Sequence, residues 1–193
     1  MRQIPNITGF TNDELIIYTD GSFNNKNGTG YGFLICDSKN NIIVESYGHL
    51  DEKKFISHRN VYGEIIGCMR AINFCIKHTD CKKFKIFADY KGVECWANET
   101  WKRNKELTIT YNKYIKNVRS SGYKINILHV DGHSGVDGNE RADELAKLGR
   151  DNCFSNEGRI ILYMDGTKVE FKIWNYINSI EFISILLFFC IFI

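Results

Sequence analysis

Apolar residues recur along the chain in short blocks whose spacing predicts strands first and helices later. Near the N-terminus three β-rich blocks alternate with clusters of Gly, Asn and Asp, a pattern typical of an antiparallel meander. The predicted strands are 15–19, 31–36 and 42–47. The stretch between the first two, 21–30 (GSFNNKNGTG), is so rich in Gly and Asn that we expect it to be a turn.

From Asn60 the apolar period changes to that of a helix. Apolar side chains recur every three or four positions through about Lys77, which predicts one amphipathic helix with an apolar face made by Val61, Ile65, Cys68, Ile72 and Cys75. Further along we predict a strand at 85–88, helices at 92–99 and 107–118, a strand at 124–130 and a helix at 139–148. The order β-β-β-α-β-α-α-β-α predicts an α/β fold with a five-stranded mixed sheet flanked by helices.

Residues 151–193 depart from this pattern, and we expect them to form a C-terminal extension to a domain at 15–150, with 1–14 as an N-terminal lead. Asp-Gly separates two alternating runs, 160–164 and 167–173, and predicts a β-hairpin. We expect this hairpin to be an appendage outside the core, so the extension should be dispensable for chemistry.

The chain ends in the apolar run FISILLFFCIFI at 182–193. A helix of that length spans about 18 Å, whereas a membrane core is about 30 Å thick, so the run is too short to cross a membrane alone. It is interpreted either as an end segment packed on the protein or as a peripheral membrane contact.

Composition narrows the class of protein without naming a function. With 193 residues, 44% of them hydrophobic, and one proline, the chain is expected to form a single compact domain. A net charge of only +2 excludes a histone-like binder that relies on charge alone. Seven cysteines without a C-x-x-C pair favour buried free thiols over a structural zinc site, and the N-terminus lacks a signal peptide, so we expect a cytoplasmic protein.

Four acidic residues lie where predicted elements end or begin. Asp20 follows the first strand, Asp89 follows 85–88, Glu64 lies early in the first helix and Asp143 early in the last. If the fold brings them together, each pair repels by about 4 kcal/mol at 4 Å and an effective dielectric constant near 20. Two Mg²⁺ ions, or Mn²⁺, would neutralise them and support phosphodiester hydrolysis. Taken singly, each acid has an ordinary alternative as a turn residue, a surface charge or a helix-terminal residue.

The strings YTDGS, NVYGE, FADYKGVECW and GHSGVDGNERADELAK occur in an order that resembles the type 1 ribonuclease H family, over about 15–150. Within that family the third acid, followed by Tyr-x-Gly, resembles one subgroup. The resemblance implies a ribonuclease H-like fold and a set of catalytic, metal-binding acids at Asp20, Glu64, Asp89 and Asp143. It also implies that His133 assists proton transfer to the leaving group or product release.

The resemblance further implies residues that bind substrate. Asn60 matches a family asparagine that contacts the RNA 2′-hydroxyl, and Asn25 and Asn27 are candidates in the loop after the first strand. A basic and aromatic stretch after the third acid is expected to bind DNA-strand phosphates through Lys91, Trp96, Lys102 and Arg103. As an alternative, these basic side chains form an ordinary solvated helix face.

Two departures from the family concern hybrid selectivity. Tyr90-Lys91 stands where relatives commonly have Ser-Gln, and Val61 stands where many have a second asparagine.

The function implied by the resemblance is endonucleolytic hydrolysis of the RNA strand of RNA–DNA hybrids by two metal ions, leaving 5′-phosphate and 3′-hydroxyl ends. The alternatives are a hybrid-binding module without turnover and another ribonuclease H-like nuclease such as a resolvase. We expect a monomer that needs no small-molecule cofactor.

Overall fold

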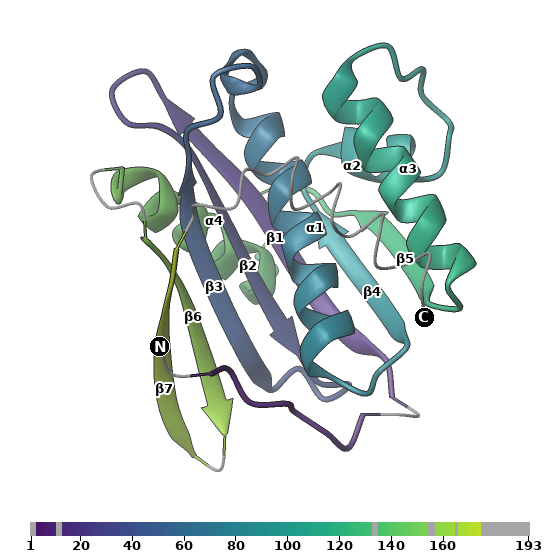
Figure 1. The fold of residues 1–193 in the computed structure, drawn as a ribbon, viewed down its shortest axis with the longest axis vertical. Helices are drawn as coiled ribbons and strands as arrows, with labels where there is room; N and C mark the ends of the chain where they lie inside the picture. The colour runs from purple at the N-terminus through teal and green to yellow at the C-terminus, as the bar shows by residue number, and fades with distance from the viewer. Residues whose placement is uncertain (1–2, 11–12, 133–134, 154–156, 165, 175–193) are drawn as a thin grey trace.

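The computed structural model describes residues 3–10, 13–132, 135–153, 157–164 and 166–174 (Figure 1). The elements follow the predicted order as far as the last predicted helix, and two strands come after it. The strands are β1 (Leu15–Asn24), β2 (Gly28–Cys36), β3 (Ile42–Leu50), β4 (Lys83–Ala88), β5 (Lys124–His129), β6 (Glu157–Met164) and β7 (Thr167–Trp174). The helices are α1 (Asn60–His78), α2 (Lys91–Ala97), α3 (Glu106–Ser120) and α4 (Asp137–Asp151), with a 3₁₀ turn, η1 (Ile56–His58), before α1.

The strands of the described residues form one mixed sheet in the order β5-β4-β1-β2-β3-β6-β7. The pairs β1–β4 and β4–β5 are parallel, whereas β1–β2 and β2–β3 are antiparallel, as expected for a meander followed by strands that alternate with helices. The predicted α/β class is therefore correct.

The predicted count of five strands is wrong, because the C-terminal hairpin joins the sheet. β6 pairs with β3, with Leu162 opposite Val44, and β7 pairs with β6. Leu162 is fully buried and Phe171 is nearly so, and both belong to the main apolar core. The hairpin itself was predicted correctly, but not as part of the core, because local alternation of side chains does not reveal which strand edge it will pair with.

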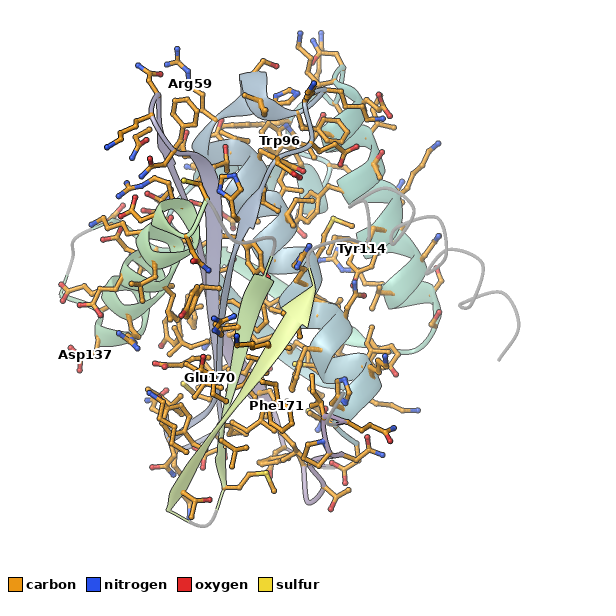
Figure 2. The ribbon with its side chains drawn as sticks, turned by 60° about the vertical axis from the view of Figure 1, so that its left-hand side comes forward. Arg59, Trp96, Tyr114, Asp137, Glu170 and Phe171 are labelled. Carbon is orange, nitrogen blue, oxygen red and sulfur yellow. The ribbon has the colours of Figure 1, made fainter. Side chains whose placement is uncertain are left out.

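Helices cover both faces of the sheet (Figures 1 and 2). Figure 2 shows Tyr114 of α3 and Asp137 of α4 on opposite sides of the sheet. The larger core cluster lies between the sheet and α1, α2 and α3, whereas a small cluster lies under α4 and consists of Leu34, Cys36, Ala142 and Leu145. From the strands, Ile16, Tyr18 and Tyr47 pack against this cluster, so the contact between α4 and the sheet has a smaller apolar core than the other face.

The stretch 21–30, predicted as a turn, is mostly strand. Pairing of β1 with β2 continues to Asn24 opposite Gly28, so the turn is confined to 25–27. The glycines are needed for close packing instead: a Cβ at Gly21 would lie 2.2 Å from the carbonyl oxygen of Asn60, and one at Gly30 would lie 2.0 Å from the backbone nitrogen of Arg150. Composition alone does not separate a glycine required by a turn from one required by a neighbouring helix.

Helix α1 approaches the sheet almost backbone to backbone. Gly63 and Gly67, one turn apart, face the sheet, and a Cβ at Gly63 would lie 2.4 Å from the carbonyl oxygen of Gly30. The backbone nitrogen of Glu64 is among the atoms nearest to Gly21. This approach places Glu64 beside the strand that carries Asp20.

Two further predictions concern cysteines and membranes. The six cysteines among the described residues are free, and all but Cys153 are buried, as predicted. None of the helices in the described ranges is long and apolar enough to span a membrane. The apolar run at 182–193 lies outside the described residues.

We expect Gly21→Ala to lower the free energy of unfolding by about 3 kcal/mol, because its methyl group would meet backbone atoms of α1 that cannot rotate away. Gly122→Ala is the matched control, since a Cβ there meets no atom within 4 Å and only its φ of +89° opposes the change, at about 1 kcal/mol. Urea unfolding measures both losses, and equal values would contradict the packing role of Gly21.

Candidate active site

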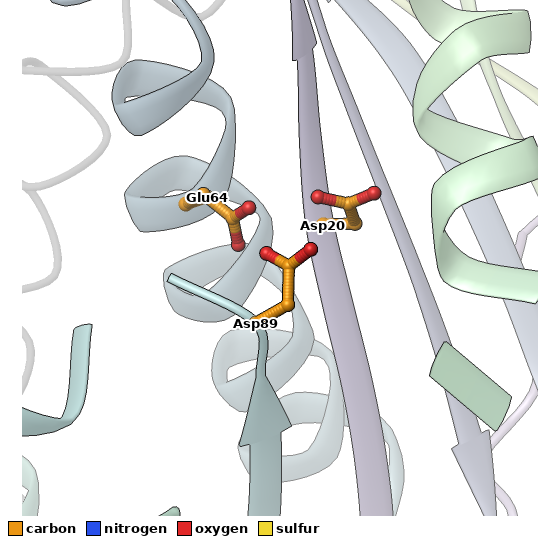
Figure 3. A group of neighbouring side chains, drawn as sticks. All are labelled: Asp20, Glu64 and Asp89. Atoms are coloured by element: carbon orange, nitrogen blue, oxygen red, sulfur yellow. The ribbon is translucent and has the colours of Figure 1, made fainter. Parts of the chain in front are cut away.

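Three acidic side chains from three elements point toward one another between α1 and the adjoining strands (Figure 3). Asp20 lies within β1, which continues beyond it to Asn24, rather than at the end of the strand as the sequence suggested. Asp89 directly follows β4, the parallel neighbour of β1, and Glu64 lies in the second turn of α1. Parallel pairing puts the ends of β1 and β4 at the same edge of the sheet, where α/β folds place their sites.

The three carboxylates form a compact group. One oxygen of each lies within 4.8 Å of one oxygen of the other two. Glu64 is 1% exposed and Asp20 is 5% exposed, whereas Asp89 is half-buried. The backbone N–H of Gly21 donates a hydrogen bond of 2.7 Å to Asp20 Oδ1, which fixes that carboxylate.

Burial and mutual repulsion raise the proton affinity of the site. Burial, together with the negative charges of Asp89 and Asp143, raises the pKa of Asp20 from an ordinary 3.8 to about 6, against the opposing effect of hydrogen bonds. Burial and the neighbouring Asp20 and Asp89 raise the pKa of Glu64 well above its usual range. Without a cation, the three carboxylates therefore resist carrying their full negative charge near neutral pH.

The donor set fits a divalent cation. Among the described residues, none of the three carboxylates forms an ion pair with a basic side chain, and the buried Glu64 Oε2 has no hydrogen-bond partner. A buried oxygen without a partner, next to two other carboxylates, is costly unless something positive compensates for it. Hard cations such as Mg²⁺ and Mn²⁺ prefer such oxygen ligands.

Asp143 lies near this group without belonging to it. It is on α4, its carboxylate accepts a hydrogen bond of 2.5 Å from Lys147 Nζ one turn later, and its side chain is 24% exposed. Its charge still contributes to the raised pKa of Asp20. The structure thus brings together three of the four predicted acids and places the fourth within electrostatic range.

The predicted histidine, His133, lies outside the described residues. The residue before it, Gly132, lies against the site, because a Cβ there would be 3.1 Å from Asp89 Oδ2. The described chain leading to His133 therefore comes within contact distance of the third acid.

The candidate RNA-binding asparagines lie on one side of the carboxylates. Asn60 is the exposed first residue of α1, with its backbone against Gly21. Asn25 is exposed in the turn between β1 and β2, and Asn27 in the same turn donates a 2.9 Å hydrogen bond to Asp151.

The predicted DNA-strand residues lie on and after α2. Lys91, the first residue of α2, and Lys102 are exposed, whereas Arg103 forms a 3.0 Å ion pair with Glu99. Trp96 is half-buried, with its ring centroid 6.0 Å from that of Trp101.

Sequence reasoning missed the polar contacts that hold α4 to the sheet. Arg150 Nη1 donates a 2.9 Å hydrogen bond to Ser22 Oγ, two residues beyond Asp20 on β1. Arg141 donates two hydrogen bonds to Glu45 of β3, at 2.6 and 3.0 Å. One feature of the sequence could have indicated these contacts. Glu45 is an acid inside an apolar strand, and a buried carboxylate requires a basic partner.

Comparison with known proteins gives a family and a fold. A family model for RNase H matches residues 12–151, and no curated protein matches the chain. The N-terminal RNase H domain of a Mycobacterium tuberculosis protein, fused to maltose-binding protein, is 19% identical, with 74% of this chain and 96% of that chain covered and a TM-score of 0.60. RNase H1 from Halobacterium salinarum is 19% identical, with 72% and 98% covered and a TM-score of 0.59. LC11-RNase H1, isolated from compost and solved with an RNA/DNA hybrid, is 22% identical, with 73% and 99% covered and a TM-score of 0.58.

We expect Asp20→Asn to stabilise the metal-free protein at pH 7.5, raising Tm by about 5 °C, because it removes a carboxylate whose charging is unfavourable in the folded state. A carboxyl whose pKa is raised on folding costs stability as pH rises from about 4 through 6, so the Tm difference should shrink toward zero at pH 4. Thermal melts in a chelator measure it. Mg²⁺ should raise Tm of the wild type more than that of the variant.

Asp151→Asn is the control with the opposite sign, because hydrogen bonds from Arg150 and Asn27 lower the pKa of Asp151 to about 2. This control should not raise Tm at pH 7.5. A rise equal to that of Asp20→Asn would mean that the gain reflects overall charge rather than the carboxylate cluster.

Proposed function

Because the RNase H family model matches most of the chain, over residues 12–151, this protein belongs to the RNase H family, and we propose that it hydrolyses the RNA strand of RNA–DNA hybrids. The observation that carries the proposal is the group formed by Asp20, Glu64 and Asp89, whose oxygens lie within 4.8 Å of one another. The solved LC11-RNase H1 complex with an RNA/DNA hybrid supports this choice of substrate.

Asp20, Glu64 and Asp89 would hold the metal, and Asp143 would complete the set from α4. When bound there, two Mg²⁺ ions, or Mn²⁺, supply an activated water and charge compensation at the leaving oxygen. The rigid placement of Glu64 by the contact between Gly21 and α1 keeps these ligands in position before substrate arrives.

The reaction joins a water oxygen to phosphorus and breaks the bond from phosphorus to the 3′ oxygen, leaving a 5′-phosphate and a 3′-hydroxyl. The 3′ oxygen must gain a proton as it leaves. We assign the assistance of that proton transfer, or of product release, to His133, since histidine titrates near neutral pH.

Substrate recognition would use exposed and half-buried residues near the start of α1, in the β1–β2 turn, and on and after α2. Asn60, with Asn25 and Asn27, would contact RNA 2′-hydroxyls and neighbouring phosphates. On and after α2, Lys91, Trp96, Lys102 and Arg103 would follow the DNA strand. Asn27 and Arg103 already have protein partners, so their contribution requires that these partners be exchanged for substrate.

A module that only bound hybrids would gain nothing from buried, mutually repelling carboxylates. The raised pKa of Asp20 and Glu64 shows that ionising these carboxylates is unfavourable in the folded protein without a cation. Metal binding would offset this electrostatic cost, and a surface that only bound hybrids would avoid it. This cost favours catalysis over binding alone.

We expect the purified protein to cleave a labelled RNA–DNA hybrid in Mg²⁺, but neither RNA duplex nor DNA duplex, and to lose cleavage in a chelator. Asp20→Asn should reduce the rate to background while hybrid binding persists, because the change removes a ligand charge and little volume. Glu106→Gln, an exposed acid on α3, is the control and should leave the rate unchanged. Comparable turnover by Asp20→Asn and the wild type would contradict the metal assignment.

His133→Ala should lower the rate by about 100-fold without eliminating it, since the side chain assists proton transfer while the carboxylates and metal remain. The pH–rate profile is the informative measurement, because the limb due to the histidine should disappear. His78→Gln, at the far end of α1 from Glu64, is the control. A loss as complete as that of Asp20→Asn would reject this role.

A further inference from the structure

Helix α4 approaches glycines of the sheet so closely that part of its contact is made by backbone rather than by interlocking side chains. A Cβ at Gly32 would lie 2.3 Å from the backbone nitrogen of Ala146, and one at Gly30 would lie 2.0 Å from that of Arg150. On the helix side, a Cβ at Gly149 would lie 2.6 Å from the carbonyl oxygen of Gly48. Interdigitated side chains normally fix how one element sits on another. Here the apolar contribution is the small cluster under α4, with Ile16, Tyr18 and Tyr47 of the strands packed against it. Directional polar contacts add to this packing in fixing the position of the helix.

Two arginines supply those contacts near the two ends of the helix. Arg150 binds Ser22 of β1, and Arg141 binds Glu45 of β3 through two hydrogen bonds. Asp143 lies between them, two residues after Arg141. The position of Asp143 along the sheet is therefore tied to the Arg141–Glu45 contact.

The C-terminal hairpin completes this contact. Tyr163 of β6 donates a 2.8 Å hydrogen bond to Glu45 Oε2, the same oxygen that accepts from Arg141 Nη2. Glu45 is 1% exposed, so its charge depends on these donors, and they hold its pKa below the usual range although burial opposes this. The pairing of Val44 with Leu162 places β6 where Tyr163 can reach.

We propose that Tyr163 is a positioning residue, which acts through Glu45 and Arg141 to fix α4 on the sheet and so to place Asp143 relative to the other three acids. This inference rests on the proposed function. It makes the hairpin part of the functional unit, whereas its sequence contains no residue of the predicted site.

The test compares Tyr163→Phe with Thr167→Val in the full-length chain. Tyr163→Phe removes the hydroxyl that reaches Glu45 and keeps the ring, whereas Thr167→Val removes a hydroxyl that donates to the carbonyl of Met164 within the hairpin. Both variants lose one hydrogen bond from the same hairpin, so a general loosening of the hairpin would affect them alike.

We expect Tyr163→Phe to lower kcat for hybrid cleavage by about 10-fold and to raise the Mg²⁺ concentration for half-maximal rate, with KM for hybrid changed less than about 2-fold. It should also reduce the rise in Tm caused by Mg²⁺ without hybrid, and increase hydrogen exchange in α4. Thr167→Val should match the wild type in all five measurements. Equal effects of the two variants, or none from Tyr163→Phe, would overturn the proposal.

A second comparison tests the route through Arg141. Effects of Tyr163→Phe and Arg141→Lys should be strongly non-additive in the double variant, because both act through Glu45. Additive effects would reject the route. If the wild type fails to cleave hybrid, the proposed function fails, while the Mg²⁺-induced rise in Tm and the hydrogen exchange of α4 still decide whether Tyr163 positions the helix.

Discussion

The close approach of helix backbone to strand backbone is the constraint on which the candidate site depends. Gly21 and Gly63 remove the side chains that would separate α1 from β1, and Glu64 is thereby brought beside Asp20. Parallel pairing of β1 with β4 then adds Asp89 at the same edge. A strand, a helix and the residue directly after a second strand thus hold three carboxylates within 4.8 Å of one another.

The resulting electrostatic cost links stability to chemistry. Burial raises the pKa of both Asp20 and Glu64, so the folded chain without a cation is penalised near neutral pH. A divalent ion bound there would remove this penalty, so the electrostatic cost of the cluster would contribute to its affinity for the ion. Asp143 lies outside this cluster, on α4, where its carboxylate pairs with Lys147 of the same helix.

The second helix at the site is held in a different way. α1 is embedded in the main core, whereas α4 rests on glycines and a small apolar cluster, and its place depends on charged hydrogen bonds to Ser22 and Glu45. Because Glu45 also accepts from Tyr163, the sheet extension made by β6 and β7 contacts the same network. The β6–β7 hairpin carries none of the predicted site residues, yet it is linked through Glu45 to the helix that carries Asp143.

The sequence by itself predicted the α/β class, the order of elements and the hairpin, because these depend on local period and on turn residues. It also named four acids, through motifs that resemble the RNase H family, and three of these cluster in the structure. It did not determine that Gly21 and Gly30 lie in strands, that β6 pairs with β3, or that Glu45 is shared by Arg141 and Tyr163. Only the tertiary structure decided these points. Strand pairing, helix approach and buried ion pairs join residues far apart in the chain. The local sequence around a glycine does not indicate which distant backbone segment will pack against it.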